Sequence, residues 1–255
     1  MGYSFRHTDL ESFSNEETTF QFLNGTNYLV QDGDQCLNRS KSDNLCKFET
    51  SEKNKKIYVI GDSMISSLVS GFLNDSITND YTIIESTKGG CALLLNTCDF
   101  FKGTERFKTL VDVENSIFIL GGRYQNHLND DITLLDIEKQ LIETINLLTN
   151  NGNKVYLIHP IPEPGINERM YYFKNSDYLD YDYKKWKDSI FELSEMLNKI
   201  NLENFILIDI DYLFCKEQKC NFKNDKHYYF LDHVHFSYFG SNYVANEIIN
   251  IIKKD

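Results

Sequence analysis

Five short apolar segments, which alternate with longer segments of helical periodicity, limit most strongly what this chain can fold into. The predicted strands are residues 57–60, 81–85, 116–120, 154–159 and 205–209, and the predicted helices are residues 64–73, 103–113, 132–148, 181–200 and 238–252. Short apolar runs are typical of strands that are buried on both faces. The alternation therefore predicts an α/β fold in which helices cover both faces of a parallel five-stranded sheet.

A polar segment, residues 1–50, precedes this pattern. It is rich in Asn, Asp, Ser and Thr and shows no sustained periodicity. We predict an N-terminal extension or linker over residues 1–50 and one domain over residues 51–255, a length that suits a sizeable single core.

The first predicted strand ends in Gly61-Asp62-Ser63 and runs directly into the first predicted helix. A serine at such a strand-to-helix corner projects from the sheet, with backbone N–H groups and the helix N-terminus behind it. The corner is a suitable place for the nucleophile of an acyl-transfer reaction. Because Gly-Asp-Ser also recurs by chance in turns, the corner needs support from a second motif.

The supporting motif is Asp232-His233-Val234-His235, which stands just before the last predicted helix. An aspartate three residues before a histidine can accept a hydrogen bond from imidazole Nδ1 and leave Nε2 free to act as a base. Ser63, His235 and Asp232 would then form a catalytic set. The alternative is that His233 and His235 only pack or face water at a strand end, and the serine corner makes this the weaker interpretation.

The cysteines occur as three close pairs, Cys36/Cys46, Cys91/Cys98 and Cys215/Cys220. Six cysteines allow fifteen pairings, and local spacing favours these three disulfides, which would place the chain in an oxidising compartment. The first pair could staple the polar N-terminal segment to the domain. The alternative is a set of buried thiols in a cytosolic protein.

No metal or cofactor is predicted. None of the cysteine pairs has the Cys-x-x-Cys spacing of a zinc site, and only Cys220 lies near a histidine, His227. A zinc site formed by His227, His233 and His235 is conceivable, but the pairing of His235 with Asp232 is the better use of that histidine.

The net charge of −12 argues against nucleic acid or an anionic membrane as the main partner, and 41% apolar residues suit a folded globular protein. No apolar run reaches the roughly 18 residues of a membrane helix, and residues 1–19 lack the apolar core of a signal peptide. Two interpretations follow: a soluble piece of a longer membrane protein, or a chain whose cysteines are not paired. We favour the first.

Taken in order, the motifs resemble those of the SGNH (GDSL-type) hydrolase superfamily. More specifically, they look like the extracytoplasmic SGNH domain fused to membrane-bound sugar O-acyltransferases of acyltransferase family three. The resemblance begins at about Cys36 and rests on the two motifs above, Lys-Gly-Gly-Cys at 88–91, Gly-Gly-Arg-Tyr at 121–124, Pro-Ile-Pro-Glu-Pro at 160–164 and the Cys215/Cys220 turn. It implies a three-layer α/β/α, flavodoxin-like fold with Ser63 as nucleophile, His235 as base and Asp232 orienting the base.

The resemblance also implies an oxyanion hole built from the nucleophile's N–H, a glycine after the second strand and an asparagine after the third. The glycine is Gly90, or Gly89 if the register slips. The asparagine is a departure, because the Gly-Gly-Arg-Tyr-Gln-Asn segment at 121–126 lacks the usual Gly-x-Asn spacing. Members fused to acyltransferases often carry Arg and an aromatic residue here, so Arg123 is the expected donor and Asn126 the weaker candidate.

The implied function is O-acetyl transfer to a cell-surface carbohydrate on the periplasmic or outer side of a membrane. A membrane acyltransferase domain, upstream or in trans, would deliver the acyl group to a sugar or polysaccharide acceptor, and the expected state is a monomer. Two alternatives stay open: a stand-alone SGNH esterase or deacetylase, and a catalytically silent carbohydrate-binding domain. Aromatic residues between Met170 and Trp186 could stack on sugar rings, although core and loop packing explains them more simply.

Overall fold

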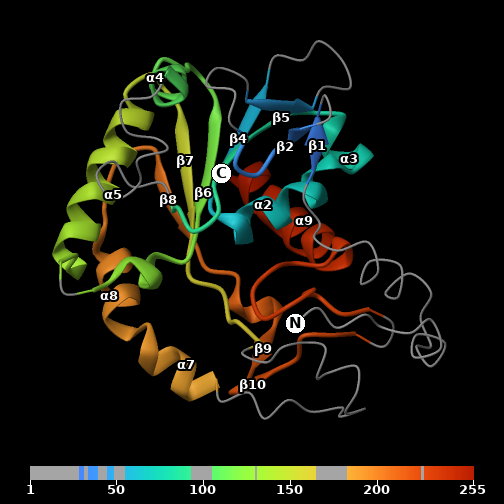
Figure 1. The fold of residues 1–255 in the computed structure, drawn as a ribbon, viewed down its shortest axis with the longest axis vertical. Coiled ribbons are helices and arrows are strands. Elements are labelled where there is room, and N and C mark those ends of the chain that lie inside the picture. The colour runs from blue at the N-terminus through green and yellow to red at the C-terminus, as the bar shows by residue number, and fades with distance from the viewer. Residues whose placement is uncertain are drawn as a thin grey trace, which may run out of the picture.

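The computed structural model describes residues 29–31, 34–39, 45–48, 55–92, 105–129, 131–164, 183–224 and 227–255. Within them, six strands form one sheet in the order β3-β5-β4-β6-β7-β8 (Figure 1). These strands are β3 (Cys46–Phe48), β4 (Lys56–Gly61), β5 (Thr82–Thr87), β6 (Ile117–Gly121), β7 (Lys154–Ile158) and β8 (Phe205–Ile208). Strands β5, β4, β6, β7 and β8 are parallel, and β3 pairs antiparallel with β5.

The five predicted strands are confirmed, but the sheet has a sixth strand that was not predicted from the sequence. Strand β3 lies in the polar segment before residue 51 and pairs Cys46 with Glu85 and Phe48 with Ile83. Three residues are too few to show a recognisable alternation of apolar and polar side chains. The Cys36–Cys46 disulfide ties this edge strand to the chain that precedes it.

Two small hairpins accompany the sheet: β1 (Val30–Gln31) with β2 (Asp34–Gln35), and β9 (Cys215–Lys216) with β10 (Lys219–Cys220). The second hairpin is the predicted stapled turn, closed by the Cys215–Cys220 disulfide.

The helices are α2 (Ser63–Val69), α3 (Asp75–Thr78), α4 (Glu105–Val111), α5 (Leu134–Thr149), α7 (Tyr183–Ser189), α8 (Phe191–Lys199) and α9 (Tyr238–Lys254), with 3-10 turns η2 (Ser70–Leu73), η3 (Tyr124–His127) and η4 (Asp211–Leu213). The helix predicted over residues 64–73 is observed as α2 followed by η2. The helix predicted over residues 181–200 is broken between α7 and α8, where Ile190 leaves the helical region with φ −107° and ψ 6°. Ile190 is buried, so the break places an apolar side chain in the core.

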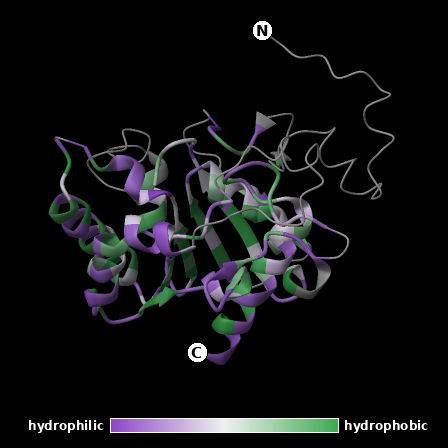
Figure 2. Ribbon diagram, turned by 90° about the horizontal axis from the view of Figure 1, so that it is seen from below, coloured by the Kyte–Doolittle hydropathy of each residue, from purple (hydrophilic) through white to green (hydrophobic). Residues whose placement is uncertain are grey.

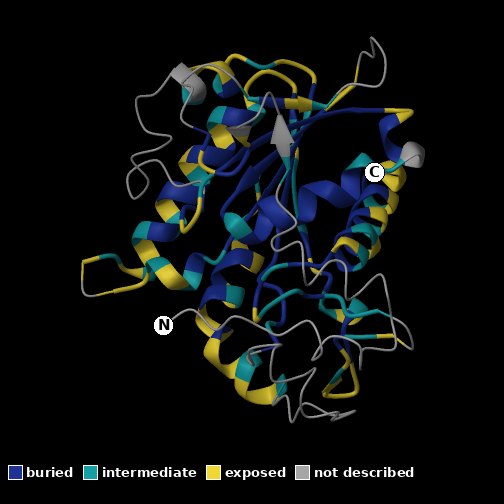
Figure 3. Ribbon diagram, turned by 45° about the vertical axis from the view of Figure 1, so that its right-hand side comes forward, coloured by how far each residue is buried: buried dark blue, intermediate teal, exposed yellow. Residues whose placement is uncertain are grey.

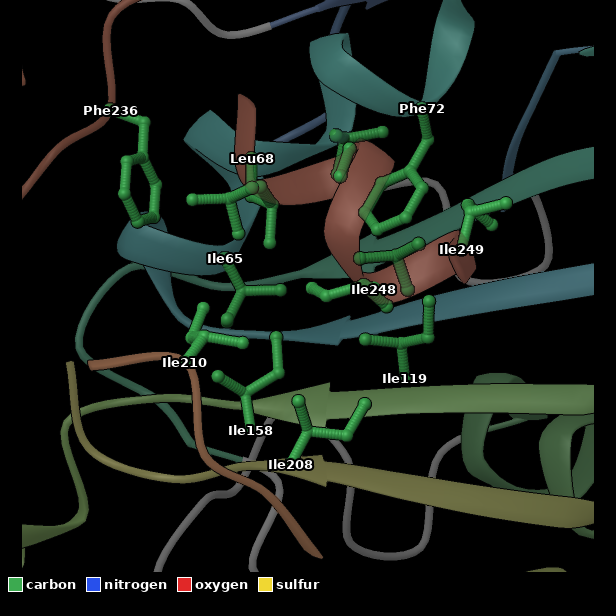
Figure 4. Close-up of a cluster of buried hydrophobic side chains, with 14 of the residues drawn as sticks. Ile65, Leu68, Phe72, Ile119, Ile158, Ile208, Ile210, Phe236, Ile248 and Ile249 are labelled. Atoms are coloured by element: carbon green, nitrogen blue, oxygen red, sulfur yellow. The ribbon is translucent and has the colours of Figure 1, made fainter. Parts of the chain in front are cut away.

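Helices cover both faces of the sheet, and the predicted three-layer α/β/α architecture is confirmed (Figure 1). On one face, Ile65 from α2 and Ile248 from α9 pack over Ile119 of β6 (Figure 4). On the other face, Leu141 of α5 and Leu197 of α8 are buried against the sheet. Burial of apolar surface on both faces stabilises this arrangement by about 25 cal/mol per Å² removed from water.

The hydropathy of the chain follows the same layers. The central strands β4, β6 and β7 are largely apolar (Figure 2) and buried, whereas the outward faces of the helices carry polar and exposed residues (Figure 3). Within the described residues, none of the helices is both long enough and apolar enough to cross a bilayer. A parallel sheet of this kind gathers functional groups at the carboxyl ends of its strands.

Candidate active site

Gly61 and Asp62 build the corner that follows β4. A side chain at Gly61 would lie 2.1 Å from the Gly121 carbonyl oxygen, so glycine is needed where β4 and β6 end this close together. Asp62 then caps α2, because its Oδ1 accepts a hydrogen bond from the Met64 N–H (3.0 Å). Ser63 is consequently the first residue of α2 and lies at the carboxyl edge of the sheet.

The structure brings Ser63 and His235 together although they are 172 residues apart, with Ser63 Oγ 3.0 Å from His235 Nε2. His235 Nδ1 lies 2.5 Å from Asp232 Oδ2. The other carboxylate oxygen of Asp232 accepts hydrogen bonds from the backbone N–H groups of Val234 (2.9 Å) and His235 (2.8 Å). Asp232 thus holds both the ring and the backbone of His235, in the hydrogen-bond pattern of a Ser–His–Asp triad.

Asp232 is charged at neutral pH. Burial would raise the pKa of its carboxyl group, but hydrogen bonds from the His235 ring and from two backbone N–H groups outweigh burial and lower the pKa below its usual value. A charged carboxylate stabilises the imidazolium that forms when the histidine takes a proton. His233, the other histidine of the motif, is 57% exposed, with Nδ1 4.0 Å from Asp232 Oδ1. His235 is therefore the histidine placed to act on Ser63.

The two glycine candidates for the oxyanion hole follow β5 and differ in their hydrogen bonds. Gly89 donates its N–H to Asn38 Oδ1 (2.9 Å). Gly90 has a positive φ of 68°, which favours glycine, and its N–H finds no acceptor among the described residues. Of the two, Gly90 is the glycine whose N–H is available to a ligand.

Arg123 follows β6 and is bound by two acidic residues. Its backbone N–H donates to Asp62 Oδ2 (2.8 Å), which joins this loop to the serine corner. Its guanidinium makes a two-point ion pair with Glu163, with Nε 2.6 Å from Oε1 and Nη2 2.8 Å from Oε2. The Arg123 side chain is 26% exposed, and its Nη1 has no partner in the described part of the chain.

Asn126, the weaker oxyanion candidate, is exposed in η3. Its backbone N–H bonds to the Arg123 carbonyl oxygen (3.0 Å), and no hydrogen bond joins its side chain to a described residue. The structure therefore gathers Ser63, His235 and Asp232 and joins Arg123 to them through Asp62, but it ties Asn126 only to its own loop.

Residues that were not singled out from the sequence also shape the site. Glu163 lies in the proline-rich segment at residues 160–164, and its pairing with Arg123 becomes visible only in the folded structure. Tyr124 is fully buried and its hydroxyl has no partner among the described residues; burial, and secondarily the charge of Asp62, raise its pKa. Burial lowers the pKa of His127, and the charge of Asp62 opposes this shift. These side chains share one sequence signal, which is that each lies in a loop segment that follows a buried strand.

Two of the three predicted disulfides, Cys36–Cys46 and Cys215–Cys220, are present. Cys91 is disulfide-bonded as well. Its predicted partner, Cys98, lies outside the described residues.

The predicted aromatic segment is described only at its end, where the rings of Tyr183 and Trp186 stack with centroids 5.7 Å apart. The other aromatic residues of the segment, Tyr171, Tyr172, Phe173, Tyr178 and Tyr181, lie outside the described residues. No cluster of three or more metal-ligating side chains occurs in the part of the chain that the structure describes. His227 instead stacks on Phe239, with ring centroids 4.4 Å apart.

A Ser–His–Asp hydrogen-bond chain at the carboxyl edge of a parallel sheet is an arrangement typical of α/β serine hydrolases and acyltransferases. The family model described as "SGNH domain (fused to AT3 domains)" matches residues 31–250, and this chain belongs to that family. The resemblance seen in the sequence motifs is thereby confirmed.

Solved structures share the fold at low sequence identity. A Bacteroides fragilis protein assigned as an acylhydrolase matches with a TM-score of 0.50 and 15% identity, over 81% of this chain and 90% of the other. A Bacillus subtilis protein matches with a TM-score of 0.47 and 14% identity, over 79% of this chain and 57% of the other. A salicylyl-acyltransferase from a tetracycline biosynthetic pathway matches with a TM-score of 0.45 and 14% identity, over 78% of this chain and 54% of the other. Curated proteins yield no match.

Proposed function

We propose that this chain catalyses acyl-ester chemistry on carbohydrate, with Ser63 as nucleophile, His235 as general base and Asp232 as the group that orients His235. The observation that carries the proposal is the continuous hydrogen-bond chain from Ser63 Oγ through the His235 ring to Asp232. A serine hydroxyl is a weak nucleophile unless a base removes its proton, and the 3.0 Å distance from Ser63 Oγ to His235 Nε2 supports His235 as that base.

In the first half-reaction, Ser63 Oγ bonds to the acyl carbonyl carbon while its proton passes to His235 Nε2. Negative charge develops on the carbonyl oxygen, and the proposed donors are the N–H groups of Ser63 and Gly90 and the guanidinium of Arg123. The ester bond then breaks as His235 returns the proton to the leaving oxygen, and the acyl group stays on Ser63.

In the second half-reaction, His235 removes a proton from water or from a sugar hydroxyl, and that oxygen attacks the acyl-serine. The bond between the acyl carbon and Ser63 Oγ then breaks, and His235 returns the proton to Ser63 Oγ. Attack by water makes the chain an esterase, and attack by a sugar makes it an O-acyltransferase. Membership of a family named for its fusion to AT3 domains favours transfer, with a membrane domain delivering an acetyl group. The disulfides favour the extracytoplasmic side of the membrane, where thiols are oxidised.

The domain organisation belongs to the same proposal. Residues 51–255 would make the catalytic domain, and residues 1–50 an extension that the Cys36–Cys46 disulfide and β3 fasten to it. The domain would act as a monomer on a sugar or polysaccharide acceptor.

The proposal is tested with p-nitrophenyl acetate in the presence and absence of an oligosaccharide acceptor. Wild-type protein should release p-nitrophenol and Ser63→Ala should not, while mass spectrometry should find acetyl groups on the oligosaccharide. Release without acetylated sugar would identify an esterase or deacetylase instead. Binding of oligosaccharide by wild-type protein with no turnover of any ester would contradict the proposal and indicate a silent carbohydrate-binding domain.

A further inference from the structure

Two serines on one face of α2 contact two consecutive residues of the loop that carries the histidine. Ser63 and Ser67 are four residues apart, so they lie one helical turn from each other on the same side of the helix. Ser63 Oγ lies 3.0 Å from His235 Nε2, and Ser67 Oγ accepts a hydrogen bond of 2.9 Å from the Phe236 N–H. One helix therefore holds both the nucleophile and the backbone beside the base.

The hydroxyl of Ser67 is oriented and shielded from water. It donates to the Met64 carbonyl oxygen (2.6 Å). This bond fixes the hydroxyl so that a lone pair of Ser67 Oγ faces the Phe236 N–H. Ser67 is 0% exposed, so bulk water cannot take over as the acceptor if the hydroxyl is removed. A buried N–H that loses its acceptor is costly, and the backbone around it moves to find another.

The peptide group between His235 and Phe236 is held from both sides. Its carbonyl oxygen accepts a hydrogen bond from the Leu231 N–H (2.7 Å), and its N–H donates to Ser67. Asp232 orients the His235 ring, but it belongs to the same loop and cannot place that loop relative to α2. The Phe236 ring packs in the core, yet apolar packing does not fix the direction of a peptide plane.

We propose that Ser67 is a positioning residue: by anchoring the Phe236 N–H to α2, it sets the distance between His235 Nε2 and Ser63 Oγ. The inference rests on the proposed roles of Ser63 and His235. A misplacement of about 1 Å between reacting groups costs on the order of 10²-fold in rate, so the loss of this anchor should reduce turnover.

Ser70 provides a matched control on the same helical run. It is also buried, and its Oγ lies 2.8 Å from the Oγ of Ser241, so it too bridges to the C-terminal part of the chain. Its partner lies inside α9, beyond the loop that carries His235. Ser70→Ala removes a buried hydroxyl of the same kind without releasing that loop.

The first measurement compares kcat and KM of Ser67→Ala and Ser70→Ala on p-nitrophenyl acetate, with thermal unfolding of both. We expect Ser67→Ala to lower kcat by roughly 10- to 100-fold with KM within about twofold of wild type. Ser70→Ala should lower the melting temperature while kcat stays within about twofold. Equal kcat values in the two variants would overturn the proposal.

A second pair of variants separates the hydroxyl from the volume at this position. Threonine and valine have nearly the same shape, but only threonine keeps the acceptor oxygen. Ser67→Thr should retain a kcat several-fold or more above that of Ser67→Val, and any steric strain is common to both. If Ser67→Ala does not fold, this comparison decides alone, and equal losses in both variants count against the proposal.

A readout that is independent of activity separates this inference from the proposed function. The His235 Nδ1–H proton, which bonds to Asp232, gives a downfield NMR signal whose position reports the geometry of the ring. Ser67→Ala should shift or broaden this signal, and Ser70→Ala should not. If wild-type protein hydrolyses no ester, the proposed function fails while this comparison still tests Ser67. An unchanged signal in Ser67→Ala would overturn the positioning role.

Discussion

The two sides of the candidate active site are held together in different ways. On the nucleophile side, Ser63, His235 and Asp232 contact one another directly through hydrogen bonds of 3.0 and 2.5 Å. On the oxyanion side, Arg123 is bound by acidic neighbours: Asp62 takes its backbone N–H, and Glu163 takes two nitrogens of its guanidinium.

This difference follows from what each side has to do. In the proposed mechanism, the base must already face the serine before substrate binds, which agrees with the hydrogen bonds that His235 makes to Ser63 and Asp232. Oxyanion donors act on charge that appears only in the transition state, and they are most effective when they are fixed in place but still free to donate. Among the described residues the Gly90 N–H has no acceptor and so meets this condition, whereas Arg123 meets it only through the guanidinium nitrogen that Glu163 does not bind.

The largest effect is expected when the base is removed from the nucleophile side. His235→Ala should lower kcat by on the order of 10³-fold or more, because Ser63 then has no proton acceptor. His233→Ala is the matched control, since this histidine is in the same motif but mostly exposed, and its kcat should stay close to wild type. Steady-state kinetics on an acetyl ester measures both, and a larger loss in His233→Ala would exchange the roles of the two histidines.

On the oxyanion side, Arg123→Ala should lower kcat by roughly 10²–10³-fold with little change in KM if its guanidinium stabilises the developing charge. Asn126→Ala should do much less in the same assay. A purely structural Arg123, held by Glu163, would instead lower the melting temperature and leave kcat of the folded fraction nearly intact. Unfolding curves recorded beside the kinetics separate the two roles, and a crippled Asn126→Ala enzyme would assign the oxyanion role to Asn126.

A smaller effect is expected for Glu163→Gln, which keeps the size of the side chain but weakens its hold on Arg123. If the ion pair aligns the guanidinium, kcat should fall by about tenfold, less than for Arg123→Ala. Adding Glu163→Gln to Arg123→Ala should then cause no further loss of kcat, because both changes act through one group. Additive losses in this double-mutant cycle would show that Glu163 acts independently of Arg123.

The last expected effect is on folding stability and not on kcat. It concerns a buried glutamate that is hydrogen-bonded to the helix that carries Ser63. Glu85 of β5 accepts hydrogen bonds of 2.6 Å from Ser66 of α2 and from Thr87. Burial raises the pKa of Glu85 to about 7, although these two hydrogen bonds oppose the shift. In the folded chain the Glu85 carboxyl therefore keeps its proton at pH values where the unfolded chain has lost it. The free energy of unfolding consequently falls as pH rises from about 4.5 to about 7.

Glu85→Gln removes this titration. As the pH is raised from about 5 to about 8, the melting temperature of the variant should increase relative to that of wild type. The increase should correspond to at most about 3 kcal/mol of unfolding free energy. Scanning calorimetry at several pH values measures it. A difference between the two proteins that does not change with pH would show that Glu85 titrates normally in the folded chain.

The contrast between the two sides also explains how much could be predicted from the sequence. Asp232 and His235 are only three residues apart, and Ser63 comes shortly after a strand with a clear apolar run. Both motifs can therefore be recognised as short sequence patterns. The five parallel strands were predictable because each contains a short apolar run that is visible in the sequence.

The remainder depends on contacts between distant segments. The ion pair of Arg123 and Glu163 joins loops that are 40 residues apart, and the sequence alone does not indicate that these two residues pair. The hydrogen bond from Phe236 to Ser67 spans 169 residues and involves a backbone group, which has no sequence signature. Strand β3 was missed because it is short and acquires its structure from the edge of β5 and from the Cys36–Cys46 disulfide.

The most direct test of the catalytic role of Ser63 is covalent labelling with a fluorophosphonate probe, followed by peptide mapping. Wild-type protein should carry the label on Ser63, Ser63→Ala should carry none, and His235→Ala should react far more slowly because its serine has no base. Equal labelling of wild type and Ser63→Ala, or a label mapped to another residue, would contradict the assignment of Ser63 as an activated nucleophile.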